Sequence, residues 1–366
     1  MKGLAYFVKY LAGGLLIFSG LVKLNDPVGT EIKLKEYFEV FATDFAHFFE
    51  VFVPLAMPVG MFLIILEIII GVALIINYRF KWTITIMTLM MVFFTFLTFY
   101  SAFFNKVTDC GCFGDAIHFT PWQSFSKDIF FLVLIAIMLW QQIVFKKESS
   151  LKLGNVILVG VTILSIITGI RAINHLPFVD FRPYAIGENI QANMQAAEQP
   201  VFSYVFEKNG KQVNSDKYLT EEEGYTYVSH RIVNEENTIP KITDYNIWND
   251  EYGDYTSQSL FGLKLFIIIY GTESVQPSQI EQLKQLVEDL GTEVEPIIIT
   301  SIDGMQLNSF FADYNLNIPF FYGDATVLKT MVRSTPGIML MEDGNVLGKW
   351  HYNDIPSYED AIELID

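Results

Sequence analysis

Residues 53–76 read VPLAMPVGMFLIILEIIIGVALII, and this stretch decides the fold of the first half of the chain. A helix crosses the apolar core of a bilayer with about 20 residues, so the stretch is long enough to span a membrane. Glu67 is its one charged residue. Four more stretches of the same character predict an α-helical transmembrane bundle: Leu11–Leu24 with a lead from Leu4, Ile84–Phe104, Ile129–Phe145 and Leu153–Ile170.

The first of these stretches has a second interpretation, a cleaved signal peptide. The residues that end it, Gly20-Leu21-Val22-Lys23-Leu24-Asn25-Asp26-Pro27, offer no small-x-small cleavage site. We therefore expect an uncleaved first membrane helix.

Charge divides the chain in two. Residues 1–175 contain 13 Lys and Arg against 11 Asp and Glu, whereas residues 176–366 contain 11 against 30, which gives the halves +2 and −19. An acidic half of this kind disfavours nucleic acid as a partner. The shift predicts a boundary near 171–181. The predicted parts are a four-helix membrane domain at 1–150, a fifth membrane helix at 151–175, a β-rich connecting region at 176–262 and an α/β domain at 263–366.

Basic residues in the short loops predict the orientation of the bundle, because Lys and Arg accumulate on the cytoplasmic side. If successive helices cross the membrane in opposite directions, the side predicted to be cytoplasmic contains Lys2, Lys9, Arg79, Lys81, Lys146, Lys147 and Lys152. The loops at 25–52 and 105–128 and everything after the fifth helix would face outward. Of the outer loops, residues 31–50 have amphipathic helical spacing and are expected to lie along the membrane surface.

Glu67 is costly inside a bilayer unless it is protonated, paired or functional. One interpretation is a group that handles protons or faces a quinone, and the other is a hydrogen bond between helices. Both interpretations stay open at this point.

The two cysteines of the chain form a Cys110-Gly111-Cys112 loop that is predicted to face outward. The loop has too few ligands for a structural zinc site within one chain. Neighbouring thiols outside the cytoplasm tend to oxidise or exchange, and a strained small-ring disulfide is easily reduced. The loop is therefore a candidate redox site, with a static crosslink as the alternative. His118, six residues beyond Cys112, could favour a thiolate, although an exposed loop histidine without such a role is the commoner case.

Two motifs resemble a known superfamily. Phe18-Ser19-Gly20-Leu21-Val22-Lys23, with Asp26-Pro27 after it, resembles the first segment of DoxX-like membrane proteins. Cys110-Gly111-Cys112-Phe113-Gly114-Asp115, followed by Thr120-Pro121-Trp122, resembles the MauE branch of methylamine-utilisation proteins. The resemblance covers roughly residues 1–145.

MauE-like proteins are in turn similar to the thiol-oxidising membrane enzymes of the DsbB and vitamin K epoxide reductase type. The resemblance implies disulfide formation or thiol handling outside the cytoplasm, with Cys110 and Cys112 as catalytic residues and a membrane quinone as candidate cofactor near Glu67. Those relatives use further cysteines as a relay, and this chain has none. A complete relay within one polypeptide is therefore not expected.

The acidic half begins with a predicted β-hairpin, formed by residues 201–206 and a Lys208-Asn209-Gly210-Lys211 turn. Apolar runs and amphipathic periodicity then predict alternating strands and helices. In chain order these are Leu263–Tyr270, Pro277–Gly291, Val294–Thr300, Leu307–Tyr314, Ile338–Glu342, Val346–Trp350 and Ser357–Ile365. The order βαβαββα resembles the thioredoxin fold, and the resemblance implies a cis peptide bond at Thr335-Pro336.

A thioredoxin carries Cys-x-x-Cys after the first of these strands, but here residues 271–277 contain no cysteine. Dithiol chemistry is thereby excluded from this domain. Ser274 has no neighbouring base and is not expected to be a nucleophile. His175, His230 and His351 are expected to be ordinary structural or surface histidines.

The leading hypothesis is a thiol-disulfide exchange component of the bacterial inner membrane, with its C-terminal domain in the periplasm. Cys110 and Cys112 would act on a periplasmic protein client, and the cysteine-free thioredoxin-like domain would recruit it. The second hypothesis is a non-catalytic scaffold that binds envelope proteins. A transporter ranks third, because the spans show no internal repeat.

Overall fold

The computed structural model describes residues 2–107, 111–117, 119–145, 150–271, 276–307 and 318–365. The chain forms two compact units, Met1–Arg182 and Pro183–Asp366, and each is described by itself.

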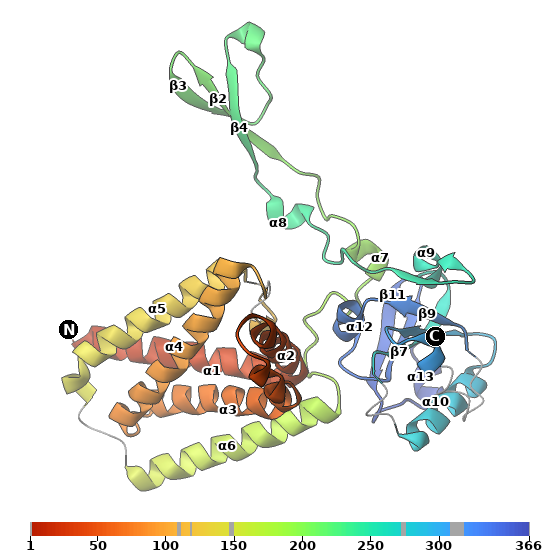
Figure 1. Ribbon diagram of the computed structural model, residues 1–366, viewed down its shortest axis with the longest axis horizontal. Helices are drawn as coiled ribbons and strands as arrows, with labels where there is room; N and C mark the ends of the chain where they lie inside the picture. The colour runs from red at the N-terminus through yellow and green to blue at the C-terminus, as the bar shows by residue number, and fades with distance from the viewer. Residues whose placement is uncertain are drawn as a thin grey trace. The chain divides into compact units, whose positions relative to one another are not determined.

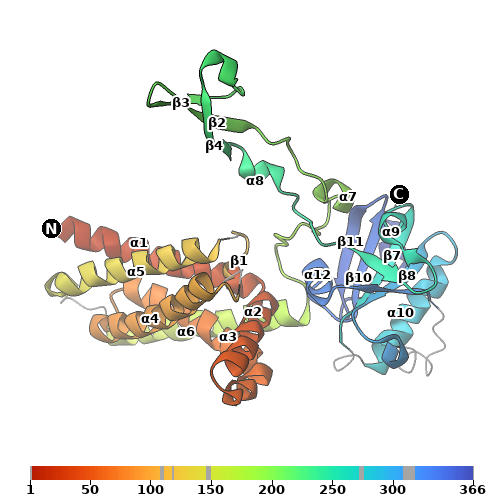
Figure 2. The ribbon, with the colours of Figure 1, turned by 45° about the horizontal axis from the view of Figure 1, so that its top comes forward.

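The first unit is helical (Figure 1). Its elements are α1 (Lys2–Asn25), α2 (Pro27–Asp44), η1 (His47–Leu55), α3 (Ala56–Ile75), α4 (Phe80–Phe104), β1 (Cys112–Asp115), α5 (Pro121–Trp140), η2 (Gln142–Phe145) and α6 (Leu151–Asn174). Helices α1, α3, α4 and α5 form the bundle, and α6 lies along α3. The short strand β1 lies against α1 and α2 (Figure 2).

Five described helical segments are long and apolar enough to cross a membrane: Lys2–Asn25, His47–Ile75, Phe80–Phe104, Pro121–Trp140 and Leu151–Asn174. The protein is thus a multi-pass membrane protein with five candidate spans, as the sequence predicted. The fourth span differs most from its predicted range of Ile129–Phe145. It begins at Pro121, because Thr120 and Gln123 form a capping box around the first turn, and it ends at Trp140.

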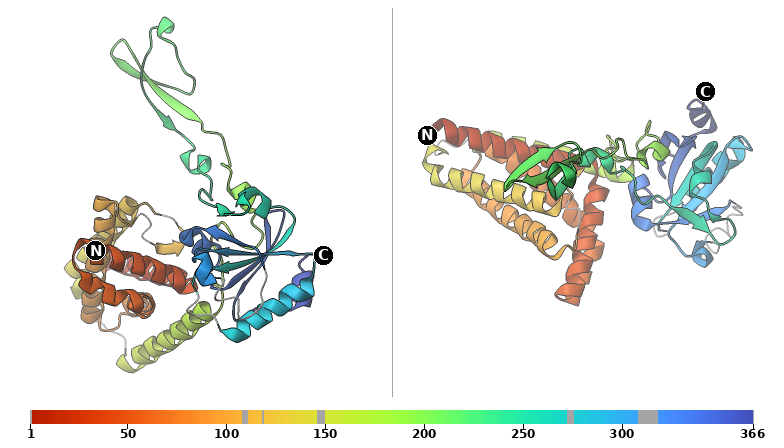
Figure 3. Two further views of the ribbon diagram at one scale, coloured as in Figure 1. Left: turned by 45° about the vertical axis from the view of Figure 1, so that its right-hand side comes forward. Right: turned by 90° about the horizontal axis from the view of Figure 1, so that it is seen from above.

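The predicted amphipathic segment at 31–50 comprises most of α2 and the start of η1. Asp26 caps α2, because its Oδ1 accepts a hydrogen bond of 2.9 Å from the backbone N–H of Gly29. Leu34, Tyr37 and Phe41 are buried along one side of the helix. Helix α2 crosses the ends of the bundle helices rather than running alongside them (Figure 3). Its place at a membrane surface stays a prediction.

Helices α1 and α3 touch through their backbones. A β-carbon at Gly13 would lie 3.0 Å from the carbonyl oxygen of Gly71 and 2.7 Å from Ile75 Cγ1. At Gly71 it would lie 2.8 Å from the carbonyl oxygen of Gly13. Small residues let the two helix backbones come this close. Lipid provides no hydrophobic driving force between helices, so close packing of this kind is a main source of helix association in a membrane.

The second unit is a mixed α/β domain. Its strands are β2 (Phe202–Lys208), β3 (Lys211–Ser215), β4 (Thr226–Ile232), β5 (Ile247–Asn249), β6 (Gly253–Asp254), β7 (Leu263–Ile269), β8 (Glu295–Thr300), β9 (Phe320–Gly323), β10 (Gly337–Glu342) and β11 (Asn345–His351). Its helices are α7 (Ile190–Asn193), η3 (Glu221–Glu223), α8 (Glu235–Thr238), α9 (Thr256–Ser259), α10 (Pro277–Leu290), α12 (Ala325–Met331) and α13 (Tyr358–Ile362).

The larger sheet of this unit has the strand order β11-β10-β7-β8-β9-β5-β6 among the described residues. Strands β7, β8 and β9 are parallel, and β10 and β11 are antiparallel additions at one side. Helices cover both faces of the sheet. Ile298 joins the cluster that includes α10 and α13. The next residue, Ile299, and Leu328 of α12 each lie 3.2 Å from the position of a β-carbon at Gly323 of β9.

The sequence predicted β7, α10, β8, β10, β11 and α13 close to their observed bounds. Strand β9 and helix α12 were not predicted, because both segments are too short to show a periodic pattern of apolar residues. The predicted helix Leu307–Tyr314 lies outside the described residues except for Leu307. Ser274 also lies outside them. The predicted hairpin is β2 and β3, joined by Asn209 and Gly210 with positive φ.

The Thr335–Pro336 peptide bond is cis, as the sequence led us to expect. The Thr335 hydroxyl donates a hydrogen bond of 2.8 Å to the carbonyl oxygen of Gly271. It also accepts one from the backbone N–H of Tyr270 at 3.1 Å. The loop before β10 is therefore tied to the end of β7.

The α1–α3 contact predicts opposite outcomes for two neighbouring glycines. Gly13→Val would force a side chain into the α3 backbone, and overpacking of this kind costs roughly 1–3 kcal/mol. Gly14→Val is the matched control, since nothing lies within 4 Å of a β-carbon there. Thermal unfolding followed by circular dichroism in detergent micelles should show a lower Tm for Gly13→Val alone. Equal Tm values for the two variants would contradict the close packing.

Candidate functional site: a cavity beneath the cysteine loop

The Cys-Gly-Cys-Phe-Gly motif forms a tight turn. Cys110 and His118 lie outside the described residues, and of Cys112 the backbone is described, as the first residue of β1. Gly111 and Gly114 have φ values of +58° and +52°. The backbone N–H of Gly114 donates a hydrogen bond of 3.0 Å to the carbonyl oxygen of Gly111. Both glycines therefore occupy the left-handed region, where other residues are strained, and this accounts for their place in the motif.

The turn is seated on α1 and α2. A β-carbon at Gly114 would lie 3.5 Å from Val22 Cγ1 of α1. A β-carbon at Gly111 would lie 3.2 Å from Lys33 Cγ of α2. The residue between the two cysteines thus lies against the aliphatic stem of a lysine.

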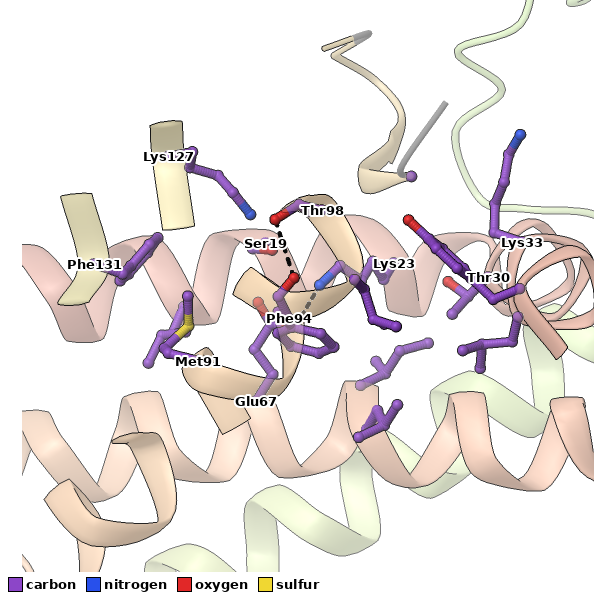
Figure 4. Close-up of a pocket in the computed structure, with 17 residues that line it drawn as sticks. Ser19, Lys23, Thr30, Lys33, Glu67, Met91, Phe94, Thr98, Lys127 and Phe131 are labelled. Atoms are coloured by element: carbon purple, nitrogen blue, oxygen red, sulfur yellow. Dashed lines mark hydrogen bonds and ion pairs between the residues drawn. The ribbon is translucent and has the colours of Figure 1, made fainter. Parts of the chain in front are cut away.

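A cavity inside the bundle opens below this turn (Figure 4). Its volume is about 80 Å³. Its polar lining comes from five elements and from the turn itself: Ser19 and Lys23 of α1, Thr30, Lys33 and Tyr37 of α2, Glu67 of α3, Thr98 of α4, Lys127 of α5, and Gly111. Three of these side chains are lysines and one is a carboxylate.

Glu67 forms an ion pair across the bundle. Its Oε2 lies 2.5 Å from Lys23 Nζ, and both side chains are largely buried. Lys23 also lies 5.4 Å from the centre of the Phe94 ring, a cation–π distance. Figure 4 shows the two charged groups meeting between α1 and α3. The interhelical interpretation of Glu67 is therefore observed, and its role toward a cofactor stays a prediction.

A second buried carboxylate lies beside the cavity. Asp128 of α5 is fully buried, and its Oδ2 accepts a hydrogen bond of 2.9 Å from the Thr98 hydroxyl. Its Oδ1 lies 2.9 Å from Lys127 Nζ. Nearby, the hydroxyl groups of Tyr37 and Ser101 are 2.7 Å apart. The Thr98–Asp128 and Tyr37–Ser101 hydrogen bonds thus pair buried polar groups around the cavity, whereas Asp128 Oδ1 has the Lys127 ammonium near it without a hydrogen bond.

The structure places Glu67 and Gly111 of the cysteine loop, which are far apart in sequence, at one cavity. Sequence reasoning missed Lys23, Lys33, Lys127, Thr98 and Asp128 as parts of this site. A signal existed for two of them, because Lys23 and Asp128 are charged residues at or near apolar stretches, where a charge implies a buried partner. Their partners, however, are set by helix packing.

The comparisons with known proteins concern the same part of the chain. Residues 1–141 match a family model, that of methylamine utilisation protein MauE. Residues 1–141 are MauE-like. No curated protein and no solved structure gives a significant match. The match supports the MauE resemblance seen in the motifs, and it places both the cysteine loop and Glu67 inside the MauE-like region.

The candidate quinone can be tested against this cavity. The lining has suitable chemistry, since Lys23 and Thr98 carry hydrogen-bond donors and Phe94 offers a ring face. The size does not fit: the cavity measures about 80 Å³, and a cavity that takes up a benzene ring measures about 150 Å³. The cavity is large enough for several water molecules but too small for a quinone ring.

The buried ion pair predicts strong coupling between its two residues. Lys23→Met would leave the Glu67 carboxylate buried without its cation, which costs about 3–5 kcal/mol. The double variant Lys23→Met/Glu67→Gln removes both charges and should recover a large part of that loss. The measurement is a double-mutant cycle of unfolding in detergent micelles.

The control for this cycle is the more exposed pair of Lys35 and Glu31, whose Nζ and Oε1 atoms are 2.8 Å apart. Its cycle should give less than about 1 kcal/mol. If the effects of Lys23→Met and Glu67→Gln simply add, the two charges do not stabilise each other.

Proposed function

We propose that the protein is a thiol-disulfide exchange component of the bacterial inner membrane that acts through Cys110 and Cys112. The observation that carries the proposal is the position of the loop, a tight glycine turn over a lysine-rich cavity in a MauE-like bundle. Lysines near a thiol stabilise the thiolate, which is the reactive form in exchange. A static crosslink across one residue would add little stability, because it closes a very short loop.

The proposed reaction is an exchange between two dithiol–disulfide pairs. A client thiolate attacks one sulfur of the loop disulfide, the Cys110–Cys112 bond breaks, and a mixed disulfide forms. The second client thiolate then attacks the client sulfur of that mixed disulfide. The client leaves oxidised, and the loop holds two thiols, having gained the two electrons and two protons that the client lost. A second protein disulfide returns the loop to its oxidised form by the same steps in reverse.

We propose a thioredoxin-like fold for residues 263–366, with the role of docking the client rather than oxidising it. The strand order and directions around β7, β8 and β10 support the fold. The domain contains no cysteine. This absence also supports the alternative of a non-catalytic scaffold, in which the acidic half binds envelope proteins and the loop disulfide is inert.

Trapping of free thiols with a mass-tagged alkylating agent in intact cells tests the proposal. Cys110 and Cys112 should shift between tagged and untagged states when the cells are treated with a membrane-permeant reductant or oxidant. Variants with Cys110→Ser or Cys112→Ser should cause accumulation of reduced clients. If the loop stays in one state under both treatments and the variants have no effect, the scaffold replaces the exchange function.

The proposed orientation places the cysteine loop and the second unit in the periplasm. In a variant without the two native cysteines, Lys211→Cys in the exposed β3 strand should react with a membrane-impermeant maleimide in intact spheroplasts. Lys81→Cys at the start of α4 should react only after the membrane is permeabilised. The reverse labelling pattern would place the loop in the cytoplasm.

A further inference from the structure

A groove in the second unit, here called the β5–β9 groove, lies where these two strands adjoin the end of β8. Its volume is about 380 Å³. We propose that it binds a guanidinium group. The docking role proposed for this unit makes an arginine side chain of the client the expected source, and in this respect the inference rests on the proposed function. The lining side chains are Asp244, Asn246, Trp248, Ser301, Tyr322 and Asp324.

One side of the groove follows from the alternation of residues that leads into β5. Tyr245 and Ile247 are buried, with exposed fractions of 4% and 1%. Asp244, Asn246 and Trp248 between and beside them are exposed. The alternation is that of an extended segment, whose successive side chains point to opposite sides. Two buried anchors thus hold a carboxylate, an amide and an indole in one row.

Sheet pairing brings the other side of the groove to this row. Strand β5 is antiparallel to β9, with Trp248 opposite Tyr322. The centroids of the two rings are 5.0 Å apart. Strands β8 and β9 are parallel, so Ser301, which follows β8, and Asp324, which follows β9, lie at their carboxyl ends. In open α/β sheets this is the edge outside which ligands bind.

The two carboxylates of the groove are held differently. Asp324 Oδ1 accepts hydrogen bonds from the backbone N–H groups of Thr326 and Val327, at 2.7 and 3.1 Å, so this carboxylate has a fixed position. Asp244 forms no hydrogen bond or ion pair with any residue that the structure describes. Its carboxylate is therefore available to a ligand.

The charge around the groove favours a cation. Both ionised lining residues are acidic, and no lysine or arginine lies among the described residues that line it. Lys241, the basic residue nearest to them in sequence, is paired with Glu188, with 3.4 Å between Nζ and Oε2. Residues 176–366 contain 11 basic against 30 acidic residues, and a field of this sign attracts cations over a longer range.

Among cations, a guanidinium group fits the lining best. It is planar, stacks on aromatic rings and has five N–H donors in its plane. Trp248 and Tyr322 supply the rings, and the acceptor oxygens come from the acidic, amide and hydroxyl side chains beside them. A metal ion fits less well, because no three His, Cys, Asp or Glu side chains group together in the described part of the chain.

The experiment measures peptide binding to the full chain in lipid nanodiscs by saturation-transfer difference NMR. The protein carries Cys110→Ser and Cys112→Ser, so that no thiol exchange contributes. The probe is the acetylated and amidated tripeptide Gly-Arg-Gly. The same peptide with citrulline in place of arginine keeps the shape and removes the charge. The arginine peptide should bind, and the citrulline peptide should not, because its neutral group forms neither the charge-assisted hydrogen bond nor the cation–π contact.

Two substitutions and one control assign the binding to the groove. Asp244→Asn should raise the Kd of the arginine peptide about tenfold, as loss of one charge-assisted hydrogen bond would cause. Trp248→Ala should raise it about threefold through loss of a cation–π contact. The matched control is Asp250→Asn, which removes an equal charge just after β5 and outside the lining. It should leave the Kd unchanged.

Equal signals from the arginine and citrulline peptides would overturn the inference, as would an unchanged Kd in Asp244→Asn. The compound n-butylguanidinium distinguishes the sources of the group. If it binds and the arginine peptide does not, the groove takes a free guanidinium compound, and the docking of a client arginine is overturned. The measured protein has no thiols, so failure here is distinguishable from failure of the exchange function, which is read from the redox response of the thiols in cells.

Discussion

Glu67 places a charge within a membrane span, and the rest of the membrane unit depends on how that charge is satisfied. Its partner, Lys23, comes from a different helix, so the pair can form only if α1 and α3 lie in one register. The contacts of Gly13 with Gly71, and of Gly20 with Ile68, allow that register by bringing the two backbones together. Shape and charge therefore specify the same arrangement of the two helices.

This arrangement also creates the cavity. A bundle lined only by apolar side chains could close completely, whereas lysines and carboxylates keep polar space between the helices. The Lys23–Glu67 pair lies in its wall, and the cysteine turn and Lys33 lie where α2 adjoins it. One buried ion pair thus links the stability of the bundle to the surroundings of the loop.

Much of this architecture could be predicted from the sequence. The spans could be predicted because an apolar run of membrane length is rare outside spanning helices. Strands β7 and β8 could be predicted because strands buried on both faces have continuous apolar runs, here rich in isoleucine. The start of α5 was missed, since the capping signal of Thr120 and Gln123 lies outside the apolar run. Glu67 was recognised as a charge that needed a partner. Lys23 could not be named as that partner, because the two residues are 44 positions apart and only helix packing joins them.

The central claim is that the loop cysteines form and resolve bonds with another protein, and a trapped mixed disulfide tests it most directly. With Cys112→Ser or Cys110→Ser, the remaining thiolate can attack the disulfide of the protein that reoxidises the loop, which forms a mixed disulfide and releases one thiol of that protein, but the missing cysteine cannot resolve the mixed disulfide. The account predicts that one of these variants, purified from cells under acid quench, carries a covalent protein adduct that disappears on reduction. The double variant should carry none. Absence of any reducible adduct in both single variants, with the thiols shown to be accessible, would contradict the account.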